Sequence, residues 1–180
     1  MGALWFVGRF DISKLKSFSY EECLLYYLWF GRVLVNWHNS WLIDELCQRF
    51  RLSKKNLTEE FENNIVSLST GKINEIEFWH LIGRKMDSYH LENLKDSLYD
   101  DIFRRLISIN DSVYLLTKKL KEKGMALGIL SNTEQVTFSI VNEIMSLNHF
   151  EYKFLSYKIG YAKPDKRIYQ HVVENLSFNK

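Results

Sequence analysis

The 180-residue sequence is poor in the residues that mark irregular or cross-linked proteins. It contains one proline, eight glycines and two cysteines. So little proline and glycine leaves little room for long irregular stretches and excludes a collagen-like repeat. Cys23 and Cys47 do not have the spacing of a metal or redox motif. The chain is therefore expected to fold around an ordinary hydrophobic core.

Neither sign of charge dominates, and long apolar runs are lacking. Lys plus Arg number 24 and Asp plus Glu number 22, which gives a net charge of +2. The densest lysine cluster, at 118–123, is typical of a solvated helix end, so no nucleic-acid partner is expected. No apolar stretch reaches the roughly 20 residues of a membrane span, and the first ten residues lack a signal-peptide pattern. We expect a cytoplasmic protein without a membrane partner.

The apolar residues, 46% of the chain, fall into two kinds of pattern. Residues 24–35 are almost continuously apolar up to Gly31 and Arg32, which indicates a buried strand that enters a tight loop. Residues 38–110 show four successive helical periodicities and no strand signal. The first has an Asn39/Ser40 cap, the third starts with a capping box formed by Asn74 and Glu77, and the fourth carries leucines at 91, 94, 98 and 106.

From residue 111 onward, helices alternate with strands. Asp111 is expected to cap a helix with Leu116 inward, and a six-residue apolar strand follows from Met125. A helix with Ile144 inward, a short strand near residue 155 and a last helix opened by Asp165 complete the pattern. Strands that alternate with helices predict a Rossmann-like α/β fold with a parallel sheet. We predict an N-terminal extension (1–23), a helical cap (38–110) and an α/β core that is truncated at its C-terminus (24–37 and 111–180).

Polar residues follow the predicted strands at the edge where open parallel sheets bind ligands. The hydroxyl of Ser131, the backbone N–H groups that open the next helix and the ammonium of Lys163 would together form a cradle for a phosphate. Two structural alternatives remain open from position alone. Ser131 would serve as a helix cap, and Lys163 would be a solvated loop lysine.

Three segments resemble a known family. GRVLVNW at 31–37, ILSNT at 129–133 and GYAKPDKRIYQHV at 160–172 are similar in order and spacing to the haloacid dehalogenase-like hydrolase superfamily. Within it they resemble the helical-cap branch that contains sugar-phosphate phosphatases and the phosphatase domain of soluble epoxide hydrolases. The resemblance implies a Mg²⁺-dependent phosphatase of small phosphorylated metabolites. It implies a phosphate-binding role for Ser131, Asn132 and Lys163, with Ser131 and Lys163 in the catalytic set.

The sequence departs from the family at the nucleophile and at the metal site. The family's first strand ends in a nucleophilic Asp, but the alignment places Trp29 there, and an indole cannot attack phosphorus or bind Mg²⁺. Gly31 occupies the acid/base position. The acidic pair that holds the metal is missing, since Lys180 falls where the next strand would begin. The chain is therefore expected to be a pseudoenzyme that binds no Mg²⁺.

Two alternatives accompany this interpretation. Asp11, in the segment Phe10–Ser13, superficially mimics the nucleophile motif, so an active phosphatase that uses Asp11 is one alternative. A non-catalytic binding or interaction protein is the other. A sheet without its next strand would leave residues 24–30 exposed at an edge. We expect either that the apolar run from Ala3 to Val7 covers this edge or that the chain self-associates through it.

Overall fold

The computed structural model describes residues 26–28 and 33–176. Three parallel strands form its central sheet in the order β1 (Tyr26–Leu28), β4 (Leu127–Ser131) and β5 (Tyr152–Leu155). Within the described residues β1 pairs with β4 alone. All five residues of β4 are buried. The carboxyl ends of the three strands therefore lie at one edge of the sheet, as the alternation of strands and helices predicts.

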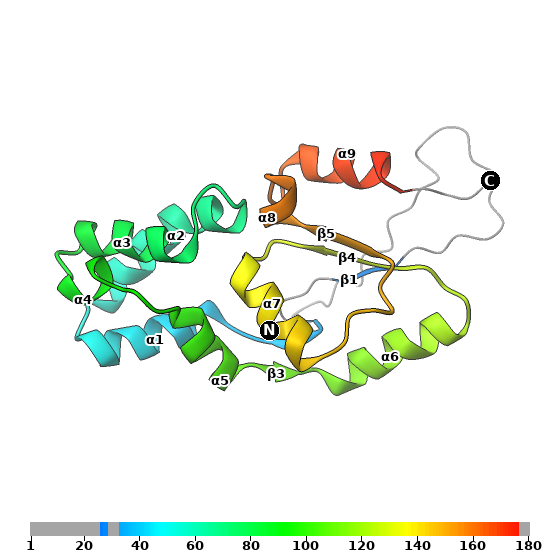
Figure 1. The fold of residues 1–180 in the computed structure, drawn as a ribbon, viewed down its shortest axis with the longest axis horizontal. Coiled ribbons are helices and arrows are strands. Elements are labelled where there is room, and N and C mark those ends of the chain that lie inside the picture. The colour runs from blue at the N-terminus through cyan, green and yellow to red at the C-terminus, as the bar shows by residue number, and fades with distance from the viewer. Residues whose placement is uncertain (1–25, 29–32, 177–180) are drawn as a thin grey trace, which may run out of the picture.

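Helices cover both faces of this sheet (Figure 1). One face carries α6 (Asp111–Glu122) and α7 (Gln135–Ile144), and the other carries α8 (Ser156–Ile159) and α9 (Lys166–Glu174). Successive residues of β4 point to opposite faces. Ile129 accordingly belongs to the core beneath α7, whereas Leu130 packs in a smaller cluster with Ile168 of α9. Both layers of the predicted α/β core are thus present.

The helical cap forms the other end of the molecule (Figure 1). It contains α1 (Asn39–Phe50), α2 (Lys54–Ser69), α3 (Glu75–Lys85), α4 (Tyr89–Glu92), the π-helical turn η2 (Tyr99–Phe103) and α5 (Arg104–Leu106). The two connections to the core run side by side as antiparallel strands, β2 (Val35–Asn36) and β3 (Ser108–Ile109). The fold class, a Rossmann-like core with a helical cap inserted after the first strand, is confirmed.

The predicted fourth cap helix is not continuous. The chain leaves the helix after Glu92 and resumes as η2 at Tyr99. The carboxylate of Glu75 accepts hydrogen bonds from the Ser97 hydroxyl (2.6 Å) and the Tyr99 backbone N–H (2.9 Å), which fixes the break. Strand β3 was also not predicted, because a two-residue strand has no measurable periodicity.

Several local predictions need correction. The N-cap residue of α1 is His38 rather than Asn39 or Ser40, and the N-cap residue of α6 is Asn110 rather than Asp111. Leu116 and Ile144, predicted to face inward, are exposed at 53% and 43%. By contrast, the predicted capping box of α3 is confirmed. The side chain of Asn74 accepts a hydrogen bond from the backbone N–H of Glu77, and the carboxylate of Glu77 accepts one from the backbone N–H of Asn74.

Some predictions concern residues outside the described ranges. These are the 1–23 extension, the edge-covering run from Ala3 to Val7, Asp11, Trp29 and Gly31. None of the helices within the described ranges is both long enough and apolar enough to cross a membrane.

Candidate functional site

Ser131 is the last residue of β4 and lies at the carboxyl edge of the sheet. It stands opposite Leu155, the last residue of β5, and the parallel register places Leu28 of β1 opposite Ile129. The next helix, α7, has Glu134 rather than Ser131 at its N-cap. The alternative interpretation of Ser131 as a helix cap is therefore wrong. Its buried hydroxyl lies 3.3 Å from the backbone oxygen of Asn132.

Lys163 returns to the same edge from the loop between α8 and α9. Its Nζ donates a hydrogen bond to the carbonyl of Leu130 at 2.8 Å. Its backbone N–H donates to Asn132 Oδ1 at 2.7 Å, and Asn132 Nδ2 donates to its carbonyl at 2.9 Å. The peptide bond that joins Lys163 to Pro164 is cis. Lys163 is thus not a solvated loop lysine, and the prediction that Ser131 and Lys163 lie at one edge is confirmed.

The two amide ends of Asn132 both bind the backbone of Lys163. These two hydrogen bonds fix the distance between the loop after β4 and the loop before α9. Burial lowers the pKa of the Lys163 ammonium to about 8, because the charged form loses part of its hydration. The edge therefore carries a positive charge at neutral pH, and about half of this charge is lost near pH 8.

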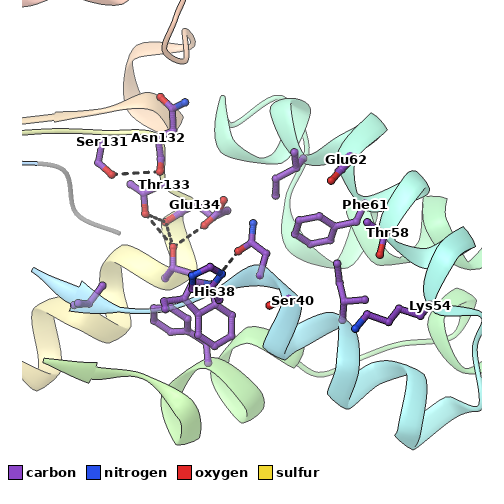
Figure 2. A pocket seen from close by; sticks show the side chains of 17 residues that line it. His38, Ser40, Lys54, Thr58, Phe61, Glu62, Ser131, Asn132, Thr133 and Glu134 are labelled. Carbon is purple, nitrogen blue, oxygen red and sulfur yellow. Dashed lines mark hydrogen bonds between the residues drawn. The ribbon is translucent and has the colours of Figure 1, made fainter. Parts of the chain in front are cut away.

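A cavity of about 710 Å³ separates the cap from the core beside these residues. Figure 2 shows Ser131, Asn132, Thr133 and Glu134 on the core side of it, with Lys54, Thr58, Phe61 and Glu62 of α2 across from them. Trp37, His38 and Ser40, at the start of the cap, also line it. The cavity is large enough for a small metabolite and has polar groups on both walls.

Glu134 was not predicted as a site residue. It is half-buried on the core wall, and burial raises the pKa of its carboxyl, while a hydrogen bond from Thr137 Oγ1 to Oε2 (2.8 Å) opposes this shift. Its position directly after the SNT segment was visible in the sequence. What the sequence could not show is that α2 closes over the opposite side and makes this carboxyl part of a cavity wall.

Comparison with known proteins decides the family. A sequence model described as haloacid dehalogenase-like hydrolase matches residues 33–180. The chain belongs to the haloacid dehalogenase-like hydrolase family. No curated protein matches the chain in sequence.

Solved structures of this family share the fold. A haloacid dehalogenase family enzyme from Bacteroides thetaiotaomicron, in complex with magnesium and inorganic phosphate, is 25% identical with a TM-score of 0.68, over 84% of this chain and 77% of that one. A predicted family hydrolase from Porphyromonas gingivalis is 17% identical with a TM-score of 0.65, over 84% and 74%. A phosphatase of the family from Thermococcus onnurineus is 14% identical with a TM-score of 0.51, over 85% and 71%.

Structures of a family enzyme from B. thetaiotaomicron contain magnesium, and a metal ion at the corresponding edge of this chain would need ligands from the residues there. Mg²⁺ prefers carboxylate oxygens in an octahedral arrangement. The described ranges contain no group of three His, Cys, Asp or Glu side chains that could hold a metal. The edge instead presents a hydroxyl, an amide and the ammonium of Lys163, and Glu134 is the one carboxyl among the described residues that line the core wall. The donors that the described residues of this edge supply do not by themselves fit Mg²⁺.

Proposed function

We propose that this member of the haloacid dehalogenase family binds a small phosphorylated metabolite without hydrolysing it. The proposal rests on one observation: Ser131 and Lys163 lie near each other at the carboxyl edge of the sheet, beside a cavity of about 710 Å³. An ammonium and a hydroxyl at such an edge are suited to the oxygens of a phosphoryl group. The relative from B. thetaiotaomicron, crystallised with inorganic phosphate, supports the same ligand class.

Each residue has a distinct role in this proposal. Ser131 and Lys163 bind the phosphoryl oxygens, through a hydrogen bond and through charge. Asn132 acts mainly by position, because both ends of its side chain are engaged with the backbone of Lys163. The organic part of the ligand occupies the cavity, where Phe61 and Thr58 of the cap would contact it. Without a metal ion, we expect a dissociation constant of about 1 mM.

The absence of hydrolysis follows from residue chemistry. Trp29 stands where the family has its nucleophile and Gly31 stands at the acid/base position, so neither position can form a bond to phosphorus or transfer a proton. Without a covalent nucleophile, the remaining groups position the ester and stabilise its charge only. A pseudoenzyme of this kind also has no need of the Mg²⁺ that its relatives bind.

The proposal also covers where the protein is located and whether it self-associates. A cytoplasmic location is part of this proposal, because phosphorylated metabolites are found there. Self-association through the β1 edge is supported by its pairing with β4 alone within the described residues. Sedimentation at several protein concentrations tests the second point.

The test combines turnover and binding. We expect no release of p-nitrophenol from p-nitrophenyl phosphate with added Mg²⁺, and millimolar binding of inorganic phosphate that Lys163→Ala abolishes. Asn63→Ala, at an exposed position of α2, serves as the control. Mg²⁺-dependent turnover that both Lys163→Ala and Asp11→Asn abolish would support the alternative of an active phosphatase with Asp11 as nucleophile.

A further inference from the structure

Ser156 lies where the cap, the sheet and the Ser131 loop meet. It directly follows β5 as the first residue of α8, and none of its surface is exposed. Its hydroxyl accepts a hydrogen bond from the backbone N–H of Thr133 at 3.0 Å. The same hydroxyl is placed to donate to two carbonyls, that of Ser69 in the cap and that of Thr133 in the core, the latter at 3.2 Å. One side chain thus joins the cap to the loop that carries Ser131.

The hydroxyl has one proton, so it makes a full hydrogen bond to one of these carbonyls at a time. The contact with Ser69 is the shorter of the two. Ser69 is the last residue of α2, and its carbonyl therefore has no partner within the helix. When the cap is docked, the Ser156 hydroxyl can donate to the Ser69 carbonyl. If the cap moved away, the Thr133 carbonyl would be the acceptor that remains. The direction of the hydroxyl therefore depends on whether the cap is docked.

Gly71 provides a second, independent observation at the same contact. It follows α2 by two residues and has a φ of +70°. A Cβ at this position would lie 2.5 Å from the carbonyl oxygen of Tyr157, the residue after Ser156. The backbone of the cap thus touches the backbone of the core, and any side chain larger than glycine would separate them.

We infer that Ser156 is a positioning residue that couples anion binding at the Ser131 edge to docking of the cap. Thr133 N–H is held by Ser156, and this bond fixes the loop that presents Ser131 and Asn132. When the cap docks, the Ser69 carbonyl orients the Ser156 hydroxyl and so stabilises the loop. By thermodynamic reciprocity, an anion that orders the loop favours the docked cap to the same extent. The inference rests on the proposed function, because it assumes that the edge binds anions.

The experiment measures amide hydrogen exchange and sulfate affinity in three variants of the full chain. Ser156→Ala removes the shared hydroxyl. Gly71→Ala displaces the cap and leaves every group of the core in place. Ser139→Ala is the matched control, since its exposed hydroxyl donates within α7, to the carbonyl of Gln135. We expect faster exchange at Thr133 in both test variants and a sulfate affinity about fivefold weaker, the value of one hydrogen bond.

The outcomes separate this inference from the proposed function. If Gly71→Ala changes neither the exchange of Thr133 nor the affinity for sulfate, the coupling is wrong, even where Ser156→Ala fails to fold. If the unmodified chain does not bind sulfate, the proposed function is wrong. The exchange of Thr133 in Gly71→Ala without any anion then still decides whether the cap and the loop are coupled.

Discussion

Lys163 supplies the charge of the candidate site, and its pKa sets the pH range in which the site works. Burial lowers this pKa to about 8, so the ammonium is mostly charged at pH 7 and mostly neutral at pH 9. We predict that the dissociation constant for sulfate, which does not titrate in this range, rises about tenfold between pH 7 and pH 9. Calorimetric titration measures it. Lys163→Arg should bind without this pH dependence, and an equally pH-dependent Arg variant would exclude Lys163 as the cause.

Glu75 is the residue that holds the cap together at the break in its last helix. Its carboxylate accepts hydrogen bonds from Ser97 Oγ, Tyr99 N–H and Trp79 Nε1. We predict that Glu75→Ala lowers the free energy of unfolding by about 3 kcal/mol, since several donors lose a charged acceptor. Denaturant unfolding measures this loss. Glu59→Ala, at an exposed position of α2, should change it by less than about 0.5 kcal/mol, and an equal loss in both variants would refute the role of Glu75.

At the scale of elements, α3 and α4 approach each other through Gly83. A Cβ on this residue would lie 2.4 Å from the backbone N of Glu92. Helix propensity alone favours Ala over Gly by about 1 kcal/mol, but here the clash with backbone atoms decides the sign. We predict that Gly83→Ala destabilises the protein by about 3 kcal/mol in thermal unfolding. Asn63→Ala, at an exposed position of α2, should stabilise it slightly, and a stabilised Gly83→Ala would show that α4 is not held against α3.

The sequence predicted those elements whose signals are local. The capping box at Asn74, the buried strand that ends near Ser131 and the last helix opened by Asp165 are all present. The break before Tyr99 was not predictable, because its cause is Glu75, more than twenty residues earlier. The inward direction predicted for Leu116 of α6 and Ile144 of α7 was also wrong, because these side chains face solvent rather than protein.

The residues of the candidate site were also predicted only in part. Ser131 and Lys163 were predicted because strand ends and motif order fix their place at one edge. Glu134, Ser156 and the wall formed by α2 were not, because each depends on how the cap docks on the core.

At the scale of the whole molecule, the proposal predicts that one substitution does not restore an enzyme. Trp29→Asp would supply the family's nucleophile. The described residues of the edge still offer no set of carboxylates for Mg²⁺, so the charge of the transferring phosphoryl group would not be neutralised. We predict no release of p-nitrophenol above background from this variant with Mg²⁺, measured against Trp29→Phe as the matched control. Turnover by Trp29→Asp alone would show that the metal ligands are present.

The central claim is that this chain binds phosphate esters and leaves them intact. The most direct test is phosphorus NMR of a small sugar phosphate incubated with the purified protein and Mg²⁺. The proposal predicts that the ester resonance broadens or shifts on addition of protein, that Lys163→Ala removes this change, and that no inorganic phosphate appears over hours. Inorganic phosphate in excess of the protein concentration, lost in Lys163→Ala, would contradict the claim, as would an ester resonance that the protein leaves unchanged.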